Sequence, residues 1–352
     1  MKFAVSLLLS LCVSGALSAG PFTATITNKP VFKLGEEVIV EVTLTNNHPV
    51  DYFILKRFTP LEGLRANIFT VTTNKGSVLP YDGLMFRRGP TQKDEYIKIR
   101  ANSFISSTAT LSIAYGFYEA GTYLVKLSTT LTFASSLDVG PVTQLLASNT
   151  NRLMLTVGDK QPYLTIGETH RRKDVQQKIV DDSVFNTKEM KNPKFGGTWT
   201  DVMKKDATNV YTKAFQVMLK ATDLAVFNTN RYTTWFGKIN YSGDVKSVLQ
   251  DCTNDMQVQS FTLYNGLSVR SACGRYDYAY TYHGAIRIVL CSVYYTSDFQ
   301  DKYETIVHEI THASARTEDY EYGRTNCKYL AIDDPARAVN NADNYGYFTG
   351  NL

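Results

Sequence analysis

Hydrophobic and polar residues alternate along the first half of the chain. In the segment 38–45, apolar residues stand at positions 38, 40, 42 and 44, and three of the four positions 39, 41, 43 and 45 are polar. Turn-forming residues such as Asn46–Asn47 and Asn74–Gly76 separate segments of this kind. A period of two residues is typical of strands that bury one face. The pattern therefore predicts an all-β sandwich over residues 20–157.

The segment Tyr115–Leu127 has the pattern of the terminal hairpin of an immunoglobulin-like sandwich, with a turn at Ala120–Gly121. The same region has no cysteine pair and no tryptophan for its core. Because those residues mark true immunoglobulin domains, we expect an immunoglobulin-like sandwich rather than a member of that family.

A polar and charged stretch follows, from about residue 158 to residue 197. It contains the basic triplet Arg171–Lys173 and the loop-forming segment Lys191–Gly197. Exposed linkers are preferred sites of proteolysis. We interpret residues 158–197 as a linker and the triplet as a candidate processing site.

The pattern changes again in residues 198–352. Apolar residues recur at helical intervals between Thr200 and Leu224, which predicts a long helix. The segment Phe261–Tyr295 is rich in tyrosine, valine and threonine and predicts a small sheet. Asp334–Pro335 predicts the start of a final helix, with aspartate at the N-cap and proline in the first turn. These elements predict an α+β domain.

One helix of this domain is defined by an apolar stripe and a start signal. Ser297 and Gln300 have the spacing of a capping box. The apolar positions then recur three and four residues apart, which docks one face of the helix on a core. These positions are Phe299, Tyr303, Ile306, Val307 and Ile310.

The same helix carries the sequence H-E-x-x-H at positions 308–312. Residues four apart share a face of a helix, so His308 and His312 can bind one Zn²⁺ ion while Glu309 stands beside a water molecule on the metal. A catalytic zinc site normally has three protein ligands. No histidine follows His312, and the nearest carboxylates downstream are Glu318, Asp319 and Glu321.

The residues around these carboxylates resemble a known motif. The segment Arg316–Gly323 is similar to G-T-x-D-x-x-Y-G, the second motif of the deuterolysin and peptidyl-lysine metallopeptidases, or aspzincins, with Arg316 in place of the first glycine. The resemblance extends over about the last 150 residues and includes Arg231–Gly237, Val289–Cys291 and Asn341–Asn344. It implies a zincin-type metallopeptidase domain that holds one zinc ion per chain, with Asp319 as the third ligand.

The resemblance also implies a mechanism and roles for the residues. The reaction is amide hydrolysis of protein or peptide substrates by a water molecule that the zinc ion activates. Glu309 takes the proton of this water and passes it to the leaving amine. Tyr322 corresponds to the family's tyrosine that donates a hydrogen bond to the developing oxyanion.

Substrate preference follows the family pattern only in part. Lysine-selective members have an acidic pocket for the residue on the amine side of the cut, built from an aspartate and a glutamate three residues apart. Asp343 matches the aspartate, but Gly346 stands where the glutamate is expected. We therefore expect a preference for basic or mixed residues rather than strict lysine cleavage. Alternatively, Asp343 has only a structural role in a turn.

The first 19 residues have the pattern of a secretory signal peptide, with a basic start, an apolar run and small residues near Ser18. We expect a secreted protein without a membrane span. Export agrees with an even number of cysteines after residue 19, which allows two disulfides in three possible pairings. The resemblance to the family favours Cys273 with Cys291, which leaves Cys252 with Cys327.

Two functions remain open for residues 20–157. The family has an N-terminal propeptide that contains a segment similar to Val42–Asn46 and keeps the peptidase latent, so we expect this region to dock on the catalytic domain as an inhibitor. The alternative is a secreted binding protein that acts through its β-sandwich and has lost catalysis. The formal charge of +4 is too small to indicate a nucleic-acid partner.

Overall fold

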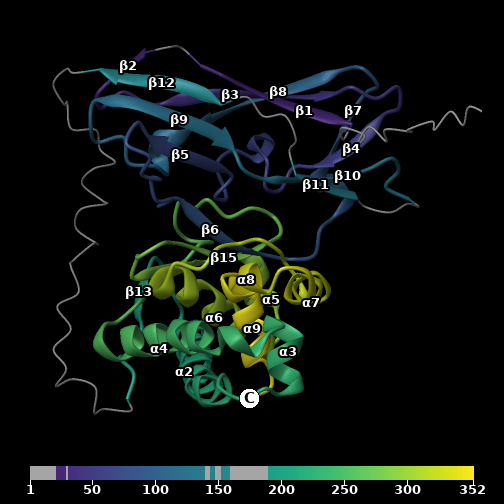
Figure 1. The fold of residues 1–352 in the computed structure, drawn as a ribbon. Coiled ribbons are helices and arrows are strands. Elements are labelled where there is room, and N and C mark those ends of the chain that lie inside the picture. The colour runs from purple at the N-terminus through teal and green to yellow at the C-terminus, as the bar shows by residue number, and fades with distance from the viewer. Residues whose placement is uncertain (1–20, 29–30, 139–142, 147–151, 159–188) are drawn as a thin grey trace, which may run out of the picture.

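The computed structural model describes residues 21–28, 31–138, 143–146, 152–158 and 189–352. The predicted signal peptide and most of the predicted linker, with its basic triplet, lie outside the described residues. Figure 1 shows a β-rich N-terminal region packed on a helical C-terminal region. Among the described residues, no helix combines the length and hydropathy needed to cross a membrane.

The N-terminal region contains three antiparallel or mixed sheets around one apolar core. Residues at alternate positions of β3 are buried, as the sequence pattern predicts. The strand orders are β1-β3-β8, β11-β10-β4-β7 and β2-β12-β9-β5. The strands are β1 (Phe22–Thr27), β2 (Val31–Lys33), β3 (Ile39–Asn46), β4 (Tyr52–Leu55), β5 (Phe69–Thr73), β7 (Tyr96–Ile99), β8 (Phe104–Thr110), β9 (Gly121–Leu127), β10 (Thr130–Ala134), β11 (Thr143–Leu146) and β12 (Leu153–Gly158).

One strand of the N-terminal half belongs to the other region. Strand β6 (Leu84–Arg88) pairs antiparallel with β15 (Asp277–Tyr282). It completes a five-stranded sheet with the order β13-β14-β16-β15-β6. Strands β13 (Lys194–Gly196), β14 (Thr262–Asn265) and β16 (Arg287–Leu290) are parallel to one another, and β15 is antiparallel to β16. The two regions thus share one sheet.

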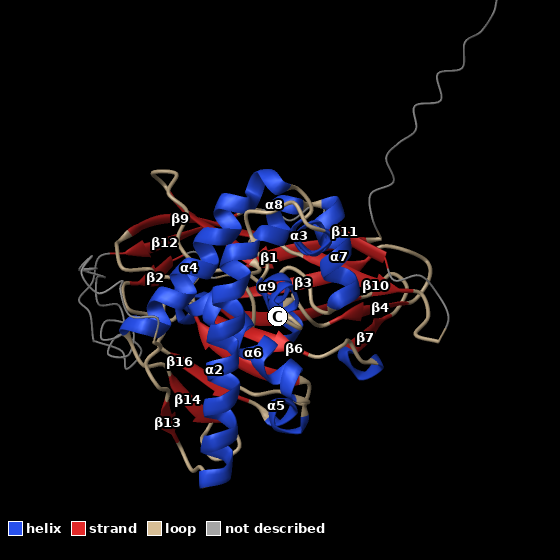
Figure 2. Cartoon of the chain, turned by 90° about the horizontal axis from the view of Figure 1, so that it is seen from below, coloured by secondary structure: helices blue, strands red, loops and turns tan. Residues whose placement is uncertain are grey.

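Helices pack across this sheet and form the second apolar core (Figure 2). The predicted long helix is α2, which begins after the N-cap Thr200. The helices are α2 (Asp201–Leu224), α3 (Asn230–Phe236), α4 (Ser242–Val258), α5 (Ser292–Thr296), α6 (Phe299–Ala315), α7 (Arg324–Asp333), α8 (Pro335–Val339) and α9 (Ala342–Thr349). As predicted, Asp334 caps a helix that begins at Pro335, but this is α8 and another helix follows it.

Helix α6 is the predicted helix that carries H-E-x-x-H. Its N-cap is Asp298 rather than Ser297, because the Asp298 side chain accepts the N–H of Asp301 at 2.8 Å. It ends at Ala315, and its C-cap Arg316 has a left-handed φ of 57°. All residues from Tyr303 to Ala313 are buried, so α6 is the central helix of the C-terminal region.

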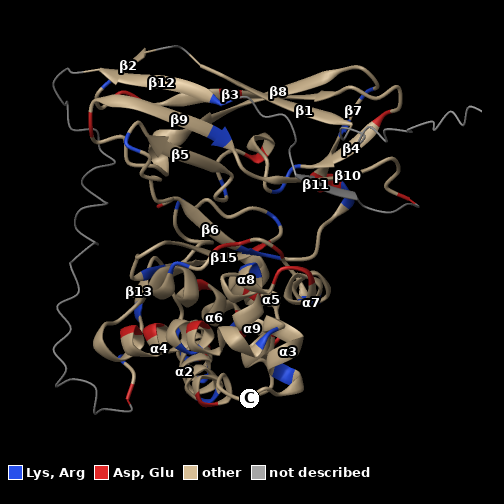
Figure 3. Ribbon diagram, in the orientation of Figure 1, with Lys and Arg blue, Asp and Glu red and all other residues tan. Residues whose placement is uncertain are grey.

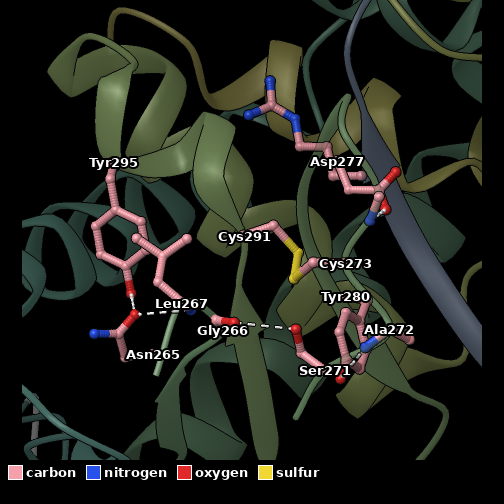
Figure 4. Close-up of a disulfide and its surroundings, with 12 residues drawn as sticks. Asn265, Gly266, Leu267, Ser271, Ala272, Cys273, Asp277, Tyr280, Cys291 and Tyr295 are labelled. Carbon is pink, nitrogen blue, oxygen red and sulfur yellow. Dashed lines mark hydrogen bonds between the residues drawn. A yellow bond between two sulfur atoms is a disulfide. The ribbon is translucent and has the colours of Figure 1, made fainter. Parts of the chain in front are cut away.

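A disulfide joins Cys273 to Cys291 and ties the loop before β15 to the end of β16 (Figure 4). The predicted pairing of Cys252 with Cys327 is wrong, since both are buried thiols, on α4 and α7. The sulfur of Cys327 lies 3.6 Å from both the Glu321 carbonyl oxygen and the Asn341 side-chain nitrogen. Pairing by elimination assumed that every cysteine of an exported chain is oxidised, whereas a buried thiol is also a good apolar core residue.

Candidate metal centre and active site

Three buried side chains converge at the C-terminal end of α6. His308 and His312 lie one helical turn apart, and the chain reverses after the left-handed Arg316 to bring Asp319 back against them. The two Nε2 atoms are 3.0 Å apart, and each lies 3.3 Å from Asp319 Oδ1. All three possible ligand atoms lie within 4.8 Å of one another.

The hydrogen bonds of the two Nδ1 atoms determine whether the Nε2 atoms at the centre are donors or acceptors. His308 Nδ1 donates to Asp343 Oδ1 at 2.8 Å, and His312 Nδ1 donates to the Thr317 carbonyl at 2.6 Å. In a neutral imidazole the other nitrogen is then an acceptor. Two Nε2 lone pairs and the unpartnered Asp319 Oδ1 therefore point at one another. Without a cation these acceptors repel, so the donor set and its oriented histidines fit a zinc ion.

Glu309 lies beside this centre with one oxygen engaged. Its Oε1 accepts the backbone N–H of Arg87 at 3.1 Å, while Oε2 is buried and has no hydrogen-bond partner among the described residues. Burial, together with the charge of Asp319, raises the pKa of Glu309 well above its usual range. A carboxylate that binds its proton more tightly is suited to accept one and pass it on.

Tyr322 follows Asp319 on the same loop and is covered by the N-terminal region. Its ring stacks on that of Phe58, with 5.4 Å between centroids and 12° between planes. The guanidinium groups of Arg57 and Arg88 lie 5.8 and 5.9 Å from its centroid. The Tyr322 hydroxyl is buried without a hydrogen-bond partner in the described part of the chain, so it remains available to donate.

Asp343, at the start of α9, contacts two parts of the site. Besides accepting from His308, its Oδ1 lies 3.5 Å from Nε of Arg87. Its Oδ2 accepts the N–H of Gly323 at 2.8 Å and the hydroxyl of Tyr347 at 3.0 Å. Asp343 therefore fixes the orientation of His308, a candidate ligand, and also faces the basic side chain of Arg87.

Two residues at the site received no role of their own in the sequence analysis. Asn341 holds the loop after Asp319, because its Oδ1 accepts the N–H groups of Tyr320 and Glu321 at 2.7 and 3.1 Å. Glu304 is a fully buried carboxylate about one helical turn before His308. Its position on the polar side of the predicted apolar stripe gave no reason to expect burial.

The strand β6 is the largest feature that the sequence analysis did not predict. The N–H of Phe86 donates to Asp319 Oδ2 at 3.2 Å, next to the bond from Arg87 to Glu309. Both arginines of the strand are buried. The pair Arg87–Arg88 was the available signal, since two adjacent charges inside an alternating strand pattern conflict with burial in a sandwich core.

Comparisons with known proteins agree on one family. Residues 221–350 match the family model of the lysine-specific metallo-endopeptidases. An extracellular protease of Aeromonas hydrophila is 26% identical over 99% of this chain and 97% of its own. A peptidyl-Lys metalloendopeptidase of Grifola frondosa is 38% identical over 35% of this chain and 36% of its own. The solved zinc peptidase from Grifola frondosa covers 43% of this chain and 96% of its own, at 28% identity and a TM-score of 0.38.

The family model and the sequence relatives define the class, and the chain is a zinc metalloendopeptidase. They also confirm the prediction from the second motif. Residues 221–350 are similar to the catalytic domain of the deuterolysin and peptidyl-lysine metallopeptidase family.

Proposed function

We propose that this chain is a secreted endopeptidase made in a latent form, which binds one zinc ion through His308, His312 and Asp319. The observation that carries the proposal is the convergence of three buried acceptor atoms within 4.8 Å, with the Glu309 carboxylate beside them. A predicted signal peptide and the similarity to an extracellular protease of Aeromonas hydrophila over 99% of the chain support export.

Each residue has a task in peptide hydrolysis. A zinc ion in this site supplies a Lewis acid that polarises a carbonyl and lowers the pKa of a water molecule. Glu309 accepts the proton of the attacking water and delivers it to the leaving amine. Tyr322 donates the hydrogen bond of its hydroxyl to the oxygen on which negative charge develops. The buried setting strengthens both effects, because charges interact more strongly where water is excluded.

Latency is the task of the N-terminal region in this proposal. Residues 20–157, as an immunoglobulin-like sandwich, act as a propeptide that docks on the catalytic domain of residues 198–352. The support is that β6 bonds to both Asp319 and Glu309 and that Phe58 covers Tyr322. A peptide substrate cannot reach these residues while β6 and Phe58 remain in place. Cleavage in residues 158–197 is the proposed first step of activation.

The preference for a basic residue on the amine side of the cut belongs to the same proposal. Asp343 carries the negative charge that such a residue requires. Its contact with Arg87 at 3.5 Å supports this role, because a basic side chain already lies against the carboxylate.

The test combines metal content with casein hydrolysis. The wild-type chain, purified and then cut by limited proteolysis in residues 158–197, is expected to hold about one zinc per chain and to hydrolyse casein. Glu309→Gln is expected to keep the zinc and to lose about 10²–10⁴-fold in rate, since only the proton transfer is removed. The exposed Glu41 on β3 provides a matched control, and Glu41→Gln should behave as wild type.

A different result supports the other function. Zinc without hydrolysis in the wild-type chain, even after the N-terminal region has been removed, would overturn the enzyme proposal. The chain would then be a binding protein that acts through its β-rich region. A Glu309→Gln chain that remains fully active would instead remove Glu309 from its proposed role as the base.

A further inference from the structure

Strand β6 follows the course that a bound peptide would take. Without β6, the edge of the catalytic sheet would be β15, and β6 pairs with it in the register Met85 to Thr281 and Phe86 to Tyr280. Addition of an extended peptide to a sheet edge is a common mode of peptide recognition. The segment crosses between the two regions, where charged segments of both signs meet (Figure 3).

The backbone of β6 lies over the catalytic groups in a defined position. The nitrogen of Arg87 donates to Glu309 Oε1 at 3.1 Å. In the proposed reaction Glu309 delivers a proton to the leaving amine, so this nitrogen stands where the amine nitrogen of a substrate must stand. Arg87 therefore occupies the position of the residue on the amine side of the cut.

The side chain of Arg87 fills a buried polar pocket, and its exposed fraction is 3%. Its Nη1 donates to the Asp301 carbonyl oxygen at 2.6 Å and also to the Thr305 hydroxyl. Its Nη2 lies 3.5 Å from Glu304 Oε2 and 4.0 Å from Asp301 Oδ1, and its Nε lies 3.5 Å from Asp343 Oδ1. The ring of Tyr278 lies 4.8 Å from the guanidinium carbon. Every edge of the guanidinium thus meets an acceptor.

Glu304 supplies a carboxylate that the sequence comparison did not predict. Gly346 of α9 packs on the backbone of Glu304, because a Cβ atom on Gly346 would be 3.1 Å from the Glu304 carbonyl oxygen and 3.7 Å from its Cβ. The second acid of the pocket therefore comes from α6, the helix that faces α9. Arg324 and Gln300 donate to Oε1 of this carboxylate at 2.7 and 2.8 Å. These bonds compensate for the loss of water around Glu304, whose exposed fraction is 0%.

We propose, building on the function proposed above, that Asp343 and Glu304 together form the pocket for the residue on the amine side of the cut. This pocket selects arginine, and Arg87 fills it in the latent chain as the arginine of a substrate does. A planar guanidinium reaches the carbonyl, the hydroxyl and the two carboxylates at once. The ammonium of lysine carries its three donors on one atom and cannot reach all of them.

The first experiment measures which bonds are cut. The zinc-loaded full-length chain, cut in residues 158–197, digests a mixture of peptides of known sequence, and mass spectrometry identifies the new N-termini. Most new N-termini are expected to be arginine, at about tenfold or more over lysine. Glu304→Gln should lower the ratio of arginine to neutral residues by about tenfold.

The control for this experiment is Asp206→Asn. Asp206 on α2 pairs with Lys302 of α6 at 2.9 Å, outside the pocket, so its loss should leave the ratio unchanged. New N-termini with no basic preference, or with lysine as frequent as arginine, would overturn the pocket assignment. Casein hydrolysis by the same sample separates this outcome from a failure of the proposed enzyme function.

The second experiment tests the self-occupied pocket. In the uncut chain, Arg87→Ala is expected to raise casein hydrolysis at least about tenfold, because the pocket contacts hold β6 in place. Lys98→Ala is the matched control, since Lys98 on β7 pairs with Asp51 within the N-terminal region at 2.7 Å, away from β6, and the chain should stay latent.

A measurement on peptides does not depend on how the variants fold. A synthetic peptide of residues 82–90 is expected to inhibit the cut, active chain, and the same peptide with Arg87→Ala should need at least about a tenfold higher concentration. Equal inhibition by the two peptides would show that Arg87 does not hold the strand in the pocket.

Discussion

At the scale of single residues, Asp343 links the metal centre to the pocket. One of its oxygens accepts from His308 and faces Arg87, and the other accepts from Gly323 and Tyr347. Burial alone would raise the pKa of Asp343, but the hydrogen bond from His308 and the charge of Arg87 hold it at about 2. Because this pKa is lowered in the folded chain, Asp343 is ionised at neutral pH. Its contribution to the free energy of unfolding is lost only as the pH falls from about 4 towards 2.

Asp343→Asn should therefore weaken zinc binding. Carboxylates that orient a ligand histidine typically contribute about 10–100-fold to metal affinity. Competition with a chromophoric chelator at pH 7 measures the change directly. Asp334→Asn serves as the control because Asp334 caps α8 by accepting the N–H of Arg337 at 3.1 Å. An unchanged zinc affinity in Asp343→Asn would show that the charge of this residue does not act on the metal centre.

At the scale of elements, the disulfide fixes the strand on which β6 lies. It closes a loop between residues 18 apart, from the approach to β15 to the end of β16. Asp277, the first residue of β15, also accepts the guanidinium of Arg65 from the N-terminal region. Figure 4 places Asp277 close to this bridge. The covalent link and the ion pair thus hold the same end of β15.

Two consequences for the cysteines can be measured. Alkylation of the denatured but unreduced chain should label Cys252 and Cys327 and leave Cys273 and Cys291 unlabelled, as peptide mapping would show. Replacing both Cys273 and Cys291 by alanine should lower the free energy of unfolding in urea by about 3 kcal/mol, because the unfolded chain gains entropy. Unlabelled Cys252 and Cys327 would mean that these two residues are disulfide-bonded after all.

The sequence predicted the elements that depend on local spacing. Helix α6, the four-residue spacing of its histidines and the loop to Asp319 all lie within about 20 residues, so periodicity and motifs reveal them. The pairing of β6 could not be predicted in this way, since Phe86 contacts Asp319 across 233 positions and a short strand pattern specifies no distant partner. Glu304 was missed because its burial depends on Arg87 and Arg324, which only the folded chain brings to it.

At the scale of the whole molecule, both ends of β6 remain in the N-terminal region. The chain enters β6 after β5 and continues into β7, and both of these strands belong to the β-rich region (Figure 1). A cut in residues 158–197 therefore separates the two regions covalently but leaves β6 attached to the N-terminal region. Release then requires that the whole N-terminal region dissociate or be degraded.

The activity of the cut chain should consequently depend on its concentration. In the proposed latent form, inhibition before the cut is intramolecular and dilution has no effect. After the cut it becomes an equilibrium between two fragments, so dilution below their Kd should raise the specific activity towards that of the free enzyme. A dilution series of cut and uncut chain against a peptide substrate measures this. Specific activity that stays constant for the cut chain over all concentrations would show that the fragments do not reassociate.

The shared strand also bears on how the chain folds and stays soluble. An unpaired strand at a sheet edge is a template on which other chains can add and aggregate. In the structure β6 pairs with β15, so this side of the catalytic sheet is closed in the folded chain. In the proposed activation the edge opens when the N-terminal region leaves, and the backbone groups that then become free are those proposed to bind an incoming substrate.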